Sequence, residues 1–144
     1  MTYLLLKTAH LLMAMAFIGT LFFQVMILWP ALQGLQTDGR QQLSQRLSQR
    51  ARQVIHWVAL VLYGTGIALA WPYRHLLESP LASTFALLLS LKLLLAVLII
   101  VHYLALILLR RRQSIAERGM YRLNVSLLLH AMLLVFCAKA MFML

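Results

Sequence analysis

The sequence predicts an all-α integral membrane protein, a bundle of four transmembrane helices with almost nothing outside the bilayer. Of its 144 residues, 63% are hydrophobic and 11% are charged, whereas a soluble domain carries about 25% charged residues. Four apolar runs are long enough to cross the hydrocarbon layer, which takes roughly 20 residues of α-helix. The expected helices are approximately 3–29, 54–71, 85–109 and 123–144. They occupy nearly the whole chain, so we expect a single transmembrane domain, residues 1–144, without a soluble catalytic module.

The ends of these runs carry residues that stop or start helices. The first run is too long for the apolar region of a signal peptide and lacks a convincing cleavage site, so we expect it to be retained as a span. Pro30 and Pro72 are expected to close the first and second helices, and Pro80 precedes the third. Residues 43–50 read LSQRLSQR, and their spacing predicts an interfacial helix that runs into the second span.

Arginines between the runs predict the orientation in the membrane. The first and third connections hold Arg40, Arg46, Arg50, Arg52, Arg110, Arg111, Arg112, Arg118 and Arg122. The second connection has only Arg74. Because cytoplasmic loops carry an excess of Lys and Arg, connections one and three are expected in the cytoplasm and both termini on the outer face. We therefore expect a multi-pass protein of the bacterial inner membrane with periplasmic termini.

The formal net charge of +10 would suggest nucleic-acid binding in a soluble protein. Here the basic residues cluster between apolar runs, where they anchor the chain on the cytoplasmic side and contact anionic lipid headgroups. The expected partner of these charges is membrane lipid, and nucleic acid is not an expected partner.

Ionisable side chains inside the spans are the first candidates for function, because they are costly in lipid and usually face the interior of a bundle. Their depth follows from a helical rise of about 1.5 Å per residue. His10, Lys92 and Lys139 lie roughly 7–9 Å from the helix midpoints toward the outer face. On helix one, the side chains that share the face of His10 are those of Met13, Phe17, Thr20 and Gln24.

A second, inner layer consists of histidines. His102 and His130 lie about 5–8 Å toward the cytoplasm, and His56 lies about 10 Å toward it. His102 and His130 are on helices joined by a short connection, so they are expected at similar depth. They are candidates for a second metal site or for the ligands on the two faces of one haem.

The outer layer suits haem. Histidine is the commonest axial ligand of haem iron, and lysine ammonium groups suit the propionates. His10 is therefore the first choice as iron ligand, with Lys92 and Lys139 as partners of the propionates. One alternative for Lys139 is that it extends to the interface, because nine residues separate it from His130 and place the two on opposite sides of a straight helix. The single cysteine, Cys137, excludes covalent haem attachment through a CxxCH motif, so any haem is expected to be held non-covalently.

Two other readings of the polar residues remain open. The histidines can form helix–helix hydrogen bonds, as in a small accessory subunit of a membrane complex. Copper is the alternative cofactor, because thioether sulfurs favour Cu(I) and methionines lie near the outer end of the bundle. These are Met13, Met15, Met141 and Met143. No expected span contains Asp or Glu, so carboxylate pairs and Ser-His-Asp arrangements are missing from the membrane interior.

Glycines on the first two helices are expected to let helices approach closely and to make room for a flat porphyrin. These are Gly19, Gly64 and Gly66.

Three segments resemble the HemJ-type protoporphyrinogen oxidases and their copper-resistance D-like (CopD-like) relatives. KTAHLLMAMAFIGTLFF, which contains His10, is similar to the lysine–histidine–glycine opening of helix one in that group. LKLLLAVLIIVHY resembles its third helix, with Lys92 followed ten residues later by His102. YRLNVSLLLHAMLLVFCAKAM resembles its last helix, with an Arg–Asn entry and Lys139 near the end. Val125 stands where the HemJ-type helix has Glu after the Asn, and Phe17-Ile18 replaces the tryptophan expected before the glycine.

The resemblance implies a four-helix inner-membrane bundle that binds haem b with His10 as axial ligand. It also implies oxidation of protoporphyrinogen IX to protoporphyrin IX, with electrons passed to a quinone or another respiratory-chain acceptor. The departures at Val125 and Phe17-Ile18 bear on the oxidase activity more than on the haem site. We therefore expect a haem b-binding redox protein of the inner membrane, with a homo-oligomer among its expected states.

Overall fold

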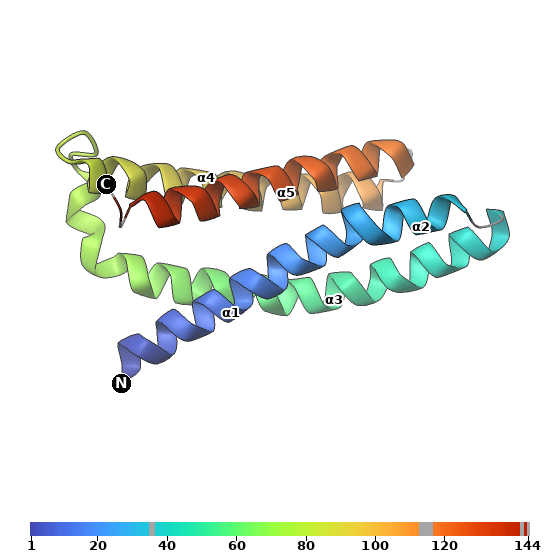
Figure 1. Ribbon diagram of the computed structural model, residues 1–144, viewed down its shortest axis with the longest axis horizontal. Helices are drawn as coiled ribbons and strands as arrows, with labels where there is room; N and C mark the ends of the chain where they lie inside the picture. The colour runs from blue at the N-terminus through green and yellow to red at the C-terminus, as the bar shows by residue number, and fades with distance from the viewer. Residues whose placement is uncertain (35–36, 113–116, 142, 144) are drawn as a thin grey trace. The chain divides into compact units, whose positions relative to one another are not determined.

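The computed structural model describes residues 1–34, 37–112, 117–141 and 143. Within these residues the chain is all-helical, and strands are missing from it. The elements in order are α1 (Thr2–Phe22), η1 (Phe23–Leu28), α2 (Trp29–Gln33), α3 (Thr37–Ala70), η2 (Trp71–Leu77), α4 (Thr84–Arg111) and α5 (Glu117–Ala140) (Figure 1). The all-α prediction is confirmed for this part of the chain.

Four helical segments of the described residues are long and apolar enough to cross a membrane. They are Thr2–Gln33, Gly39–Leu77, Thr84–Leu109 and Arg118–Ala140. Each contains or overlaps one of the four expected spans, which indicates a multi-pass membrane protein. The sidedness of the termini and the identity of the membrane stay predictions.

The first span continues past the proline that was expected to close it. A π-helical turn, Phe23–Leu28, precedes Pro30, and the Trp29 N–H donates to the Gln24 carbonyl five residues earlier. Proline has no N–H and its ring collides with the carbonyl four residues before it in a regular α-helix. The wider turn accommodates Pro30 at the start of α2, so the helix runs on to Gln33. The prediction that Pro30 ends the helix is wrong.

The second span is much longer than its apolar run. α3 is a single helix of 34 residues that includes the LSQRLSQR repeat, about 51 Å at the usual helical rise. That length exceeds the roughly 30 Å of hydrocarbon by about 20 Å. The structure thus merges the expected interfacial helix and the second span into one element. α3 ends at Ala70, just before Pro72, as expected.

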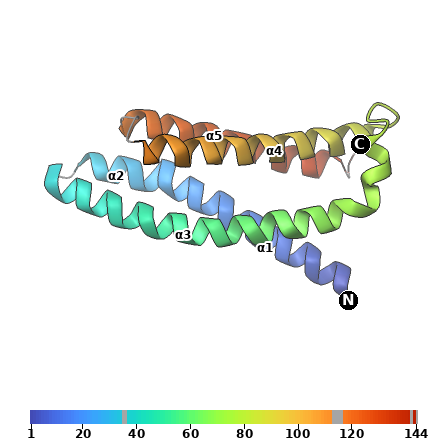
Figure 2. The same ribbon diagram turned by 180° about the vertical axis from the view of Figure 1, so that it is seen from behind.

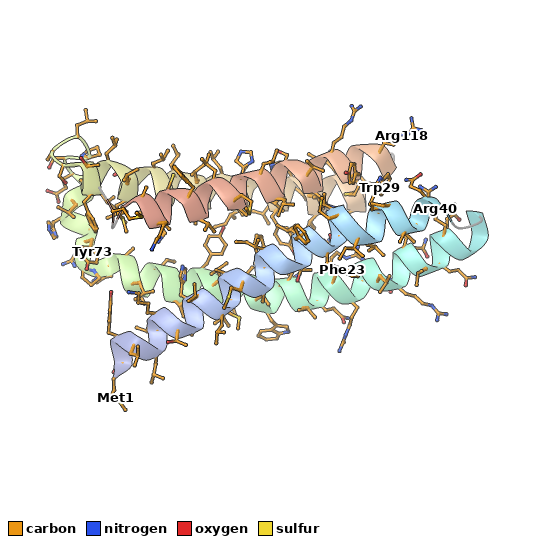
Figure 3. All side chains as sticks on the ribbon, viewed as in Figure 1. Met1, Phe23, Trp29, Arg40, Tyr73 and Arg118 are labelled. Carbon is orange, nitrogen blue, oxygen red and sulfur yellow. The ribbon has the colours of Figure 1, made fainter. Side chains whose placement is uncertain are left out.

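The chain divides into two compact units, Met1–Pro72 and Tyr73–Leu144. In the first, α1 and α3 lie side by side and run in opposite directions, as Figures 1 and 2 show. Phe17, Leu21 and Val25 are buried on the first span. At the end of this hairpin the Arg40 guanidinium lies over the Trp29 ring, 5.8 Å from its centroid, a cation–π contact between two residues that Figure 3 labels.

In the second unit α4 and α5 pack side by side as an antiparallel pair. Ser83 caps α4, because its side-chain oxygen accepts a hydrogen bond of 3.1 Å from the Ala86 N–H. Leu127 on α5 is 1% exposed and is among the most deeply buried side chains of the chain. The single-domain prediction stays a prediction, and the two units are treated separately below.

The surface of both units is strongly apolar. Trp57, Leu129 and Phe136 are more than 60% exposed, and Figure 3 shows side chains projecting outward all along the helices. Among the described residues, none of the buried ones is polar or charged. Soluble monomers rarely expose apolar patches of this extent, so these side chains are suited to contact with lipid.

Candidate functional site

His10 is held by the neighbouring helix in the first unit. Its Nδ1 lies 3.0 Å from the Leu62 carbonyl oxygen and 3.2 Å from Thr65 Oγ1, both on α3. A carbonyl oxygen only accepts hydrogen bonds, so Nδ1 carries the proton and donates it. The lone pair of the neutral ring is then on Nε2. Metal-ligating histidines usually have this arrangement, in which the second nitrogen donates to a carbonyl and fixes the ring.

The Thr65 hydroxyl accepts a hydrogen bond from His10 while it donates one within its own helix. It donates to the Val61 carbonyl at 2.7 Å, within α3, and therefore offers its oxygen lone pairs to the Nδ1–H of His10. The ring is thus fixed by one backbone and one side-chain acceptor. Two acceptors on one helix hold the imidazole more rigidly than either alone.

Gly66 gives the His10 ring its space. A Cβ built on Gly66 would lie 3.0 Å from Cε1 and 3.5 Å from Nδ1 of His10. The expected close approach is therefore confirmed at Gly66, where the approaching group is a side chain. It is not found at Gly19 or Gly64, where a Cβ would meet no atom of the described residues of this unit within 4 Å. These two glycines border open space in place of a helix contact.

The face of α1 that was expected to point inward is the less exposed one. Phe17 is 4% exposed, and His10, Met13, Thr20 and Gln24 are half-buried. His10 therefore stands at the N-terminal end of a face that already packs within the protein.

The two inner histidines come together in the second unit, as expected from their depth. The ring centroids of His102 on α4 and His130 on α5 are 5.8 Å apart, with an interplanar angle of 60°. The Nδ1–H of His130 donates to the Ser126 carbonyl at 2.7 Å. Nε2 of His102 is buried and has no hydrogen-bond partner among the described residues.

The remaining candidates are less constrained. Lys92 on α4 is half-buried, and Lys139 on α5 is exposed, as expected for a lysine that extends to the interface. Both belong to the second unit, so their pairing with propionates at His10 stays a prediction. His56 is exposed and donates from Nδ1 to the Arg52 carbonyl at 2.7 Å.

The four methionines considered as copper ligands are divided between the interior and the surface. Met141 is 9% exposed, whereas Met15 and Met143 are 54% and 72% exposed. Met13 is half-buried. Two of the four sulfur-bearing side chains thus point outward, which is the packing of ordinary apolar residues. In the described part of the chain no group of three or more His, Cys, Asp and Glu side chains is placed to hold a metal ion.

Sequence reasoning missed the second helix of the His10 site. Leu62 contributes a backbone oxygen, and no pattern of residue types predicts a backbone contact. Thr65 had a weak signal, as a hydroxyl in an apolar span immediately before a glycine that was itself a candidate. These partners lie 52 and 55 residues from His10 along the chain, so local sequence patterns could not predict either contact.

Comparison with protein-family models, curated proteins and solved structures finds no match to the chain. The resemblance to the HemJ-type and CopD-like proteins therefore stays a prediction from the three sequence segments.

Proposed function

We propose that this protein is a haem b-binding membrane redox protein in which His10 ligates the iron. The observation that supports the proposal is the double hydrogen bond that fixes His10, from Nδ1 to the Leu62 carbonyl and the Thr65 hydroxyl. This leaves a neutral imidazole with its lone pair on Nε2, the form that binds haem iron.

The surroundings of His10 suit haem binding. Gly66 leaves the imidazole room beside α3. The apolar helix faces exclude water, which favours binding of the porphyrin ring. Bound haem supplies one-electron transfer, and the contribution of the protein is to hold, orient and bury it.

The first reaction to test is the oxidation of protoporphyrinogen IX, which the sequence resemblance implies. A quinone or another respiratory-chain acceptor would take the electrons. Formation of fluorescent protoporphyrin IX by purified protein supplied with a quinone supports this activity. Haem binding without that reaction favours electron transfer alone.

An optical spectrum of the purified protein tests the proposal. Protein from haem-replete cells is expected to show a Soret band, with sharp alpha and beta bands after reduction by dithionite, and iron in proportion to protein. A colourless preparation that also fails to bind added haem would refute the proposal.

Thr65→Val is expected to weaken haem binding moderately. It removes one of the two acceptors of the His10 Nδ1–H and leaves the Leu62 carbonyl. The loss of one hydrogen bond is worth about 1 kcal/mol, or about fivefold in affinity. Haem titration followed at the Soret band measures it.

Thr20→Val is the matched control for this prediction, because the Thr20 hydroxyl donates to the Ala16 carbonyl of its own helix at 2.7 Å. It should bind haem like the unaltered protein. Equal affinities for both variants would mean that Thr65 does not support the ligand.

A further inference from the structure

Two imidazoles, those of His102 and His130, lie together in the second unit. We propose that His102 and His130 bind one monovalent copper ion between them. The proposal is independent of haem at His10, since it uses residues of α4 and α5 only. It rests on the separation of the rings, the state of their nitrogens and the number of ligands.

The two rings are close enough to share one ion. Two imidazoles joined by an N–H···N bond of ordinary length have ring centroids about 5.2 Å apart. Two imidazoles on opposite sides of one metal ion, each at a bond length of about 2 Å, have centroids about 6.3 Å apart, and less where the ion is held at a bent angle. The observed distance of 5.8 Å lies between these values, and the tilt of 60° between the planes excludes a parallel stack.

The hydrogen bond of His130 and the unpartnered nitrogen of His102 both suit metal ligation. The Nδ1–H of His130 donates to the Ser126 carbonyl, so its lone pair is on Nε2 and its ring is held in place. Nε2 of His102 is buried without a hydrogen-bond partner among the described residues. Buried polar atoms are nearly always satisfied, and a bound ion would supply the missing partner.

The number of ligands and the apolar surroundings indicate which metal ion fits the site. Structural zinc takes four ligands, whereas no group of three or more His, Cys, Asp and Glu side chains is gathered in the part of the chain that the structure describes. Cu(I) is satisfied by as few as two nitrogen ligands, and imidazole is a suitable ligand for copper. The cost of placing an ion in a low-dielectric interior rises with the square of its charge. Two neutral imidazoles in an apolar helix pair therefore favour a monovalent ion over a divalent one.

Competition with a chromophoric Cu(I) chelator tests the site. The full-length protein in detergent, kept anaerobic with ascorbate, is expected to bind one equivalent of Cu(I). His102→Asn and His130→Asn should each weaken binding at least about tenfold, the lower bound for disturbing a metal site.

His56→Asn is the matched control, because His56 makes the same Nδ1–H bond to the carbonyl four residues earlier but is exposed. It should leave Cu(I) binding unchanged. Cys137→Ala and His10→Asn identify binding elsewhere, at the buried thiol or at the His10 site.

X-ray absorption of the copper-loaded unaltered protein gives a reading that does not depend on the folding of variants. Two nitrogen neighbours at about 2 Å are expected. Sulfur neighbours, a coordination number of four, or loss of binding in Cys137→Ala or His10→Asn would overturn the proposal. So would equal affinity of the unaltered protein and the His102→Asn and His130→Asn variants. Absence of any bound copper in the unaltered protein also overturns it, and the two rings then only pack against each other.

Discussion

His10→Ala is expected to abolish the haem spectrum of the purified protein. The substitution removes the proposed iron ligand, and disturbing even the residues that support a metal ligand costs about 10- to 100-fold in affinity. Haem content per protein should therefore fall at least tenfold, as measured from the spectrum of the reduced pyridine haemochrome. The fold should persist, because the half-buried His10 lies outside the deeply buried core residues such as Leu21.

A ligand can be separated from a merely structural histidine by chemical rescue. His10→Gly leaves a gap that free imidazole fits, and added imidazole is expected to restore the Soret band. The control is His56→Ala, which removes an exposed imidazole from α3 and should keep its haem. Retention of haem by His10→Ala would assign the iron to another residue and refute the proposed ligand.

The four membrane-spanning helices were predictable because hydropathy and length alone determine them. The length of α3 was not predictable, because the LSQRLSQR segment is too polar for hydropathy to identify it as part of a span. Its Leu, Gln and Arg residues are good helix formers, so the helix extends over them without needing lipid around it. Pro30 was misjudged for a related reason. A π-helical turn of one additional residue accommodates a proline inside a span, and no residue type signals such a turn.

The candidate sites were predictable to different degrees. The pairing of His102 with His130 followed from equal depth on two helices joined by a short connection, and the structure places the rings together. The support of His10 did not follow, because it depends on the rotation of α1 about its axis relative to α3. Periodicity shows which face of a helix is apolar, but not which backbone carbonyl of its neighbour lies opposite a given side chain. The role of Gly66 depends on the same rotation.

Gly66→Val is expected to displace the His10 ring and remove most of the bound haem. A Cβ at this position already lies 3.0 Å from Cε1 of His10, which is shorter than ordinary carbon–carbon contact, about 3.5–4.0 Å. Valine adds two methyl groups to that atom. The ring must then leave the Leu62 carbonyl and the Thr65 hydroxyl, and haem affinity should fall at least tenfold, as for other losses of ligand support.

A graded series shows whether this loss arises from the contact with His10. Gly66→Ala adds only the Cβ, which the ring can meet by moving a few tenths of an ångström, so it should bind haem with an affinity between those of the valine variant and the unaltered protein. Gly64→Ala is the control on the same helix, because its Cβ meets no atom within 4 Å, and its haem affinity should not change. Equal losses at both positions would attribute the effect to helix α3 as a whole. An ordered decline from Gly64→Ala through Gly66→Ala to Gly66→Val would instead show that haem binding depends on the position of the His10 imidazole, because that ring is the neighbour that the added carbon atoms meet at Gly66.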